Sequence, residues 1–360
     1  MWGGNRRQPS RATRLGTRND VSGRPMPGVE GYPQPSERLC TDFGWVYRST
    51  SNGDDVERVS DVRLSRELFA QGYSYAELVR LTRTCQLTRI RRGAYANREE
   101  PDPHLEHRRL LVATLGQTTA ESVVSHHSAA VLHGLPVRLP QPPRAHLTRA
   151  RPNGGKIRTY VHLHVAALSE LEVCDIDAFR VTSLARTVVD LALVLDHAEA
   201  VAVGDAALSR GLLPEELDVV LRLSRRRRGR SAAHRAVSFL DGRSESVGES
   251  RSRIALAAAG LPKPELQYEV RDPSGGLVGR ADFCWEAHRT LGEFDGRIKY
   301  GRLLKPGESP GDAVFREKQR EDLLREITGF MMIRYIWADL FDPRSMCTRT
   351  HRKMRMAVAA

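Results

Sequence analysis

Three carboxylates lie close together in a stretch of alternating apolar positions. Residues 281–301 read ADFCWEAHRTLGEFDGRIKYG and place Asp282, Glu293 and Asp295 within a pattern typical of strands. A carboxylate is unfavourable in a strand and costly to bury, so a cluster of them requires a positive partner. Hard carboxylate oxygens are the ligands that Mg²⁺ prefers in proteins. The spacing therefore indicates a divalent metal site.

Such a metal could support the hydrolysis of a phosphodiester. When water attacks the phosphorus in line, the metal neutralises the nonbridging oxygens and stabilises the departing oxygen. Two strands whose carboxylates point to the same side of a sheet provide half of such a site. Glu245 and Glu249, one turn apart on the preceding predicted helix, could each complete it.

The elements that must position these carboxylates can be identified in order along residues 244–345. A helix ending at Gly260 is followed by three strands, a long amphipathic helix and a continuous apolar strand suited to a sheet interior. The pattern predicts an α-β-β-β-α-β domain. The segments are SESVGESRSRIALAAAG, LQYEV, LVGRADFCW, TLGEFDGRIKY, AVFREKQREDLLREITG and FMMIRYIW.

This order, with Asp282 in the second strand and Glu293 in the third, resembles the PD-(D/E)XK nuclease core. The run EFDGRIKY followed by REKQREDLLREITG resembles the very-short-patch-repair-like endonuclease domains of that superfamily. The resemblance implies that Asp282 and Glu293 bind Mg²⁺ or Mn²⁺ and favours Glu249 as a further ligand or water-orienting base. Lys299 would then stabilise the attacking hydroxide or the transition state as a compact charge.

The sequence departs from the family pattern at one position. The family lysine follows the glutamate by two residues, where this chain has Asp295. Either Asp295 is a further ligand, with Lys299 or Lys318 supplying the cation, or the domain is a nuclease fold that cuts nothing. The structural zinc site of the family is not visible, because Cys284 and Cys347 have no Cys or His companions at suitable spacing, and no zinc is expected.

A winged helix-turn-helix is predicted over residues 61–98. A short helix ends near Gly72, and a second begins at Ser74, which forms a capping box with Glu77. The segment LTRIRRGAYA then alternates as a strand pair that turns at Gly93. Helix, helix and strand pair is the order of a winged helix.

This segment is strongly basic. Residues 63–98 contain eight arginines and two acids, a local charge of 8 − 2 = +6. Such a patch would neutralise DNA phosphates, although an exposed, solvated face of a small interaction domain is the alternative. The arginines assigned to DNA contact are Arg80, Arg83, Arg89, Arg91 and Arg92.

The stretch from Leu64 to Ala96 resembles the N-terminal winged helix of AbiEi-type antitoxins. The segments VVSHHSAAVLHGLP (123–136) and FRVTSLARTVVDLA (179–192) resemble the region after the winged helix in such proteins, so residues 99–240 are interpreted as an AbiEi-like middle domain. The resemblance implies repression of the protein's own promoter and a cognate toxin as partner.

Histidines in the middle region suggest a metal, but the simpler interpretation is structural. His126, His127 and His133 have no acid at ligand spacing, although His162 and His164 share one face of a nearby strand. HHSAAVLHG is explained by a capped helix with an apolar face. The arginine run at 224–230 either contacts phosphates or forms a solvated linker edge.

Composition limits the remaining classes. The net charge is +12, with 50 arginines among 56 basic residues, which favours a polyanionic partner and places nucleic acid before a membrane surface. No run of eighteen apolar residues and no signal-peptide core occurs, so a cytoplasmic protein without a membrane span is expected. The five cysteines are scattered and are interpreted as reduced thiols. Residues 1–60 are expected to be mostly disordered, and 346–360 to form a basic tail.

Two functions are consistent with this mixed α/β (α+β) chain. The first is a DNA-binding protein whose C-terminal domain hydrolyses DNA phosphodiesters with Mg²⁺. The second is an AbiEi-like antitoxin or transcriptional regulator with an inactive nuclease-fold domain. Double-stranded DNA is the partner in both, with a homodimer expected if the winged helix binds a palindrome. An RNA-processing role ranks last, because aromatic residues make up only 6% of the chain.

Overall fold

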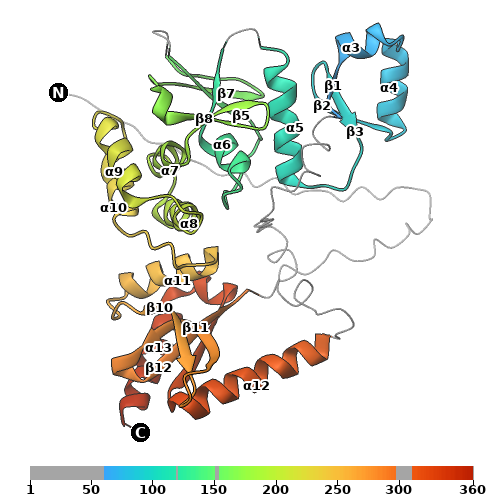
Figure 1. Ribbon diagram of the computed structural model, residues 1–360. Helices are drawn as coiled ribbons and strands as arrows, with labels where there is room; N and C mark the ends of the chain where they lie inside the picture. The colour runs from blue at the N-terminus through green and yellow to red at the C-terminus, as the bar shows by residue number, and fades with distance from the viewer. Residues whose placement is uncertain (1–60, 119–120, 151–153, 297–309, 360) are drawn as a thin grey trace, which may run out of the picture. The chain divides into compact units, whose positions relative to one another are not determined.

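The computed structural model describes residues 61–118, 121–150, 154–296 and 310–359. These residues contain both helices and strands, and the strands form three sheets, which confirms the mixed α/β class (Figure 1). Lys299 and the segment 1–60 lie outside the described residues. Within the described part of the chain, every helix is too short or too polar to cross a membrane.

The first described elements form the predicted winged helix. Strand β3 lies between β1 and β2 and is antiparallel to both. Ser74 accepts a hydrogen bond from the Glu77 amide at 3.2 Å, and the Glu77 carboxylate accepts one from the Ser74 amide at 2.7 Å, so the predicted capping box is present. The elements are β1 (Arg63–Leu64), α3 (Ser65–Ala70), α4 (Tyr75–Arg83), β2 (Leu87–Arg91) and β3 (Ala94–Asn97).

Two glycines set the turns of this unit. Gly72, between the helices, and Gly93, between β2 and β3, have φ angles of +94° and +79°, a region that side chains other than glycine rarely adopt. Leu68 and Leu78 are fully buried between the helices and the small sheet. The helix pair is therefore held by its apolar face while its arginine-bearing face remains outside.

The middle region begins with a six-stranded mixed sheet in the order β6-β7-β5-β4-β9-β8. Strands β5 and β7 are parallel, whereas β6 pairs with β7 and β8 with β9 in antiparallel fashion. The elements are α5 (Pro103–Leu115), β4 (Val123–Val124), α6 (His126–Leu132), β5 (Ala145–Arg149), β6 (Lys156–Ile157), β7 (Val161–Val165), η1 (Glu170–Glu172), β8 (Val173–Ile176) and β9 (Phe179–Thr182).

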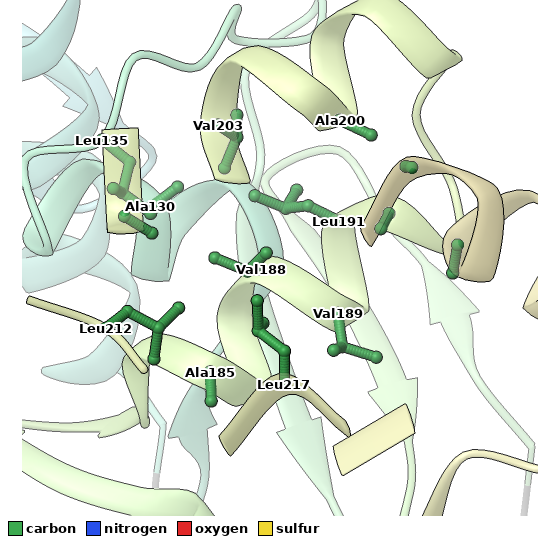
Figure 2. Packing of buried hydrophobic residues seen from close by; sticks show 14 of the residues in the cluster. Ala130, Leu135, Ala185, Val188, Val189, Leu191, Ala200, Val203, Leu212 and Leu217 are labelled. Carbon is green, nitrogen blue, oxygen red and sulfur yellow. The ribbon is translucent and has the colours of Figure 1, made fainter. Parts of the chain in front are cut away.

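A helical cluster follows this sheet. Small and branched side chains, such as Ala130, Val188, Leu191 and Val203, interdigitate in its core (Figure 2). Because many of these positions are alanine or valine, the helices can approach one another closely. The helices are α7 (Leu184–Ala192), α8 (His197–Leu208), α9 (Pro214–Leu223) and α10 (Arg230–Val237).

Buried ion pairs brace helix α7. Arg186 Nε donates to Asp190 Oδ1 at 2.9 Å, the pair expected from their i,i+4 spacing, and Arg186 Nη1 donates to Glu172 Oε1 at 2.6 Å. Arg227 also forms an ion pair with Asp190. Arg227 belongs to the arginine run 224–230, so this member of the run is neither a linker edge nor a free phosphate contact.

The C-terminal elements follow the predicted α-β-β-β-α-β order. The sheet order is β10-β11-β12-β13, with β12 and β13 parallel and the other pairs antiparallel. One apolar cluster contains Leu324 of α12, and another joins β12 and β13 to α11 and α13. The elements are α11 (Val247–Ala258), β10 (Glu265–Arg271), β11 (Leu277–Trp285), η2 (Glu286–His288), β12 (Thr290–Asp295), α12 (Pro310–Thr328), β13 (Met331–Ile336), η4 (Trp337–Phe341) and α13 (Pro343–Ala359).

The segment interpreted as a basic tail is instead part of the core. Residues 346–359 lie in helix α13, where Met346, Thr350, Met354 and Ala357 recur at helical spacing and are buried. The three arginines and one lysine between them hid this apolar stripe. They occupy the other positions around the helix.

Candidate nuclease-like site and DNA-contacting surface

Asp282 and Glu293 lie opposite each other where β11 and β12 diverge. The strands pair from Trp285–Thr290 to Phe283–Gly292, and one further step along this register brings Asp282 across from Glu293. There the ladder stops, because Asp282 Oδ2 accepts the Phe294 amide proton at 2.7 Å. Asp282 and Glu293 are thus the next residues on the two strands beyond the last paired positions, and Asp282 ends the strand pair.

Helix α11 brings Glu249 to this end of the sheet. Gly248 permits the approach, since a Cβ atom there would collide with the ring of Phe294 on β12. Glu249 is buried and accepts hydrogen bonds from Ser246 Oγ at 2.7 Å and the Glu245 amide at 2.9 Å. Burial and the nearby Asp282 carboxylate raise the pKa of Glu249 to about 7. Glu249 is therefore a buried acid of this site with a raised pKa.

Glu245, the other candidate on this segment, is directed elsewhere. Its side chain is 53% exposed and pairs with Arg280 at 2.7 Å. The two glutamates are one turn apart, but hydrogen bonds with the N-cap residue Ser246 hold Glu249 inward: Ser246 Oγ accepts from the Glu249 amide and donates to the Glu249 carboxylate. Of the two alternatives left open by the spacing, Glu249 occupies the position beside Asp282.

Gln267 on β10 joins the site and was missed from the sequence. Its Nε2 donates to Glu249 Oε2 at 2.8 Å, while its buried Oε1 has no hydrogen-bond partner among the described residues. The backbone of Gln267 has φ +56°, which interrupts the β10–β11 ladder opposite Asp282. The polar Gln267 within the strand LQYEV was the feature of the sequence that could have indicated this site. The left-handed backbone conformation of Gln267 could not be predicted from the sequence.

Glu293 has cationic partners that differ from those expected. Arg320 of α12 forms an ion pair with it, and Arg334, its register partner on β13, lies 3.4 Å away. Arg334 also donates to Glu321 at 3.0 Å. The positive charge beside Glu293 thus comes from arginines on α12 and β13, whereas Lys318 of α12 is exposed.

Asp295 ends β12 two residues beyond Glu293. Strand alternation places both side chains on the same face of the sheet, as the spacing predicts. Asp295 is half-buried, whereas Glu293 is buried. The position two residues after Glu293 is therefore occupied by an acid at the margin of the carboxylate cluster.

The oxygen donors can be compared with what Mg²⁺ requires. Glu249, Asp282 and Gln267 carry hard oxygens at one end of β10 and β11, the type of donor that Mg²⁺ prefers. Glu293 fits less well, because two guanidinium groups already face its carboxylate. Among the described residues, the side chains whose donor atoms lie close enough to share one metal ion are not these carboxylates. They are three histidines of the middle sheet.

The arginines assigned to DNA fall into two groups. Arg80 and Arg83 are exposed in the last turn of α4, and Arg89 and Arg92 are exposed on β2 and at its turn. Arg91 instead donates to Thr114 Oγ1 at 2.8 Å and packs 5.0 Å from the ring centre of Tyr160. Four of the five guanidinium groups are thus presented outward, and the fifth is engaged within the protein.

Comparison with known proteins gives a partial match only. No family model matches the chain. Two uncharacterized proteins of Mycobacterium tuberculosis, from strains CDC 1551 / Oshkosh and ATCC 25618 / H37Rv, are each 39% identical to it over 115 residues. That stretch covers 32% of this chain and 42% of each relative, so the chain spans less than half of the relatives' length. The likeness indicates common ancestry for this stretch without naming an activity.

Proposed function

We propose that this chain binds double-stranded DNA through its winged helix. The supporting observation is the outward presentation of Arg80, Arg83, Arg89 and Arg92 on one small unit. In this proposal α4 enters the major groove, and the arginines at its C-terminal end and on the β2–β3 turn contact flanking phosphates. The resemblance to AbiEi-type antitoxins extends the proposal to a cytoplasmic regulator that represses its own promoter, with a toxin as partner and a dimer on palindromic sites.

The decisive experiment is a salt titration of DNA affinity. Fluorescence anisotropy would follow the full chain on a labelled duplex for wild type, Arg80→Ala/Arg83→Ala and Arg222→Ala/Arg235→Ala. The control pair removes the same charge from exposed positions on α9 and α10. We expect the α4 pair to weaken binding and to reduce the slope of log K against log salt by about 2, since each lost phosphate contact removes about one unit. Equal effects of the two pairs would reject the winged helix as the DNA contact.

A second activity, metal-dependent hydrolysis of the bound DNA, is favoured by one observation. Glu249, Asp282 and Glu293 converge on the same end of the β11–β12 pair. In that activity Glu249 and Asp282 would hold Mg²⁺ or Mn²⁺, which supplies neutralisation of the phosphate charge. Glu293 would position Arg320 and Arg334 next to the scissile phosphate. If Asp282 held the metal without Glu249, Glu249 would instead accept the proton of the attacking water.

Cleavage is tested separately from binding. Supercoiled plasmid would be incubated with the full chain in Mg²⁺ or Mn²⁺, beside EDTA and the variants Asp282→Asn and Glu245→Gln. Hydrolysis predicts nicking that needs the metal and Asp282 but not the exposed Glu245. If the plasmid were bound but stayed intact, the proposal would be reduced to a DNA-binding regulator with an inactive nuclease fold. The role of Glu293 would then be structural, through its ion pairs with Arg320 and Arg334.

A further inference from the structure

Five histidines from separate elements meet in the middle sheet. His146 lies on β5, and His162 and His164 lie on β7, while His126 and His127 begin helix α6. The parallel register pairs His146 with His162 and Thr148 with His164. Because side chains alternate along a strand, the H-x-H spacing directs both β7 imidazoles to the face that carries His146.

The three strand histidines have the separations of a ligand set. Nδ1 of His146 lies 3.1 Å from Nε2 of His164, and one nitrogen from each of the three rings falls within 4.8 Å of the others. Two nitrogens bound to one tetrahedral zinc ion at about 2.1 Å would be about 3.4 Å apart. A small rotation of His162 would therefore complete the geometry without movement of the strands.

The surroundings hold these rings in place. His146 is buried, and His162 and His164 are half-buried. The ring of His126 stacks on His164 with centroids 3.6 Å apart. To reach this position His126 adopts φ +51°, an unfavourable conformation for a residue other than glycine.

Packing alone does not account for the polar atoms around the cluster. Nδ1 of the buried His127 and Oδ2 of the fully buried Asp190 have no hydrogen-bond partner among the described residues. Asp190 Oδ2 lies 4.0 Å from His126 Nδ1, which hydrogen-bonds with Ser125 Oγ at 3.0 Å. Arg227 is the nearby cation facing His126 and His164, and its charge is offset by its ion pair with Asp190.

We infer that His146, His162 and His164 bind one transition-metal ion, with zinc(II) as the favoured ion. Imidazole nitrogens suit zinc, whereas Mg²⁺ requires oxygen ligands. The half-exposed His162 leaves the fourth position open to a water molecule or an exogenous ligand, the arrangement that three-histidine zinc sites use for chemistry. This site differs from the structural zinc site of the nuclease family, whose ligands in this chain would include cysteines of the C-terminal domain.

The test is metal binding by the full chain after removal of metals with a chelator. Zinc would be titrated by competition with a chromophoric chelator, the stoichiometry measured by elemental analysis, and Co²⁺ used as a spectroscopic probe of tetrahedral coordination. We expect one ion per chain, and about 100-fold weaker binding in His162→Asn and in His164→Asn. Control variants are His288→Asn, a half-buried histidine of the C-terminal domain, and Glu249→Gln at the carboxylate site.

The possible outcomes are distinguishable. The inference would be overturned if the wild-type protein, shown to be folded by circular dichroism, bound no zinc. It would also be overturned if His162→Asn bound zinc with unchanged affinity. Zinc lost in Glu249→Gln but retained in both histidine variants would assign the ion to the carboxylates and also reject the inference. Because His162 is half-exposed, its asparagine variant is expected to fold, which keeps the test decisive if the more buried His164 variant does not.

Discussion

At the scale of single residues, Glu249 is a group whose ionisation affects the stability of the C-terminal domain near neutral pH. Its pKa of about 7 lies above its ordinary value of 4.5, so the folded state binds its proton more tightly than the unfolded state. The resulting stability is fully present below the ordinary pKa and is lost as pH rises through 7. We expect wild type to lose about 2 kcal/mol between about pH 5 and about pH 8 from this group alone.

Glu249→Gln should remove that dependence, because the amide retains an acceptor for the Glu245 amide without an ionisable proton. Urea unfolding at a series of pH values measures the difference between the two proteins. Glu245→Gln is the matched control, since its side chain is exposed. Parallel stability curves for wild type and Glu249→Gln would contradict a raised pKa at this position.

Residues of the site could be predicted from the sequence when local pattern identified them, and not when their partners lie far away along the chain. Asp282, Glu293 and Glu249 were readable because each sits in a locally recognisable element. Arg320 and Arg334, which pair with Glu293, come from elements that pack against its strand only after folding. His146 was overlooked for the same reason, because nothing local indicates that β5 pairs in parallel with β7.

At the scale of elements, the capping box of α4 offers a direct test of the winged helix. Ser74→Ala removes the side-chain acceptor of the Glu77 amide and should destabilise the start of α4 by about 1 kcal/mol. Hydrogen exchange of the α4 amides would then speed up about fivefold in the full chain. Glu77→Gln, which keeps its hydrogen-bonding atoms, should have a smaller effect. Unchanged exchange in Ser74→Ala would mean that packing of Leu78 alone holds the helix.

Elements with a clear period and clear end signals were predictable. Ser74 and Gly72 marked helix ends, and alternation marked β11 and β12, so the order α-β-β-β-α-β followed from local pattern. Helix α13 was not recognised, because its buried Met346, Thr350 and Met354 are separated by arginines and a lysine that lower the local hydropathy. A helix that is largely basic is recognisable as part of a core only once its partner strand is known.

At the scale of the whole molecule, helices α8 and α11 share a buried ion pair across the predicted boundary between residues 240 and 244. Arg253 Nη1 of α11 donates to Asp205 Oδ2 of α8 at 2.7 Å, and both side chains are buried, with exposures of 6% and 1%. Ser250 Oγ also donates to Asp205 at 2.7 Å. The composition of the segment between these helices suggested a linker. The ion pair between Asp205 and Arg253 could not be predicted from that composition.

Asp205→Ala would leave the Arg253 guanidinium buried without its carboxylate. Removing one partner of a buried pair costs about 3–5 kcal/mol, because the remaining charge is poorly solvated. Arg253 keeps its bonds to Ser244 Oγ and the Phe239 carbonyl, so the loss should lie toward the lower end. Urea unfolding of the full chain would be followed by circular dichroism and by tryptophan fluorescence, with Asp218→Ala on the exposed face of α9 as control. A stability loss in Asp205→Ala no larger than in Asp218→Ala would show that α8 and α11 unfold independently of this pair.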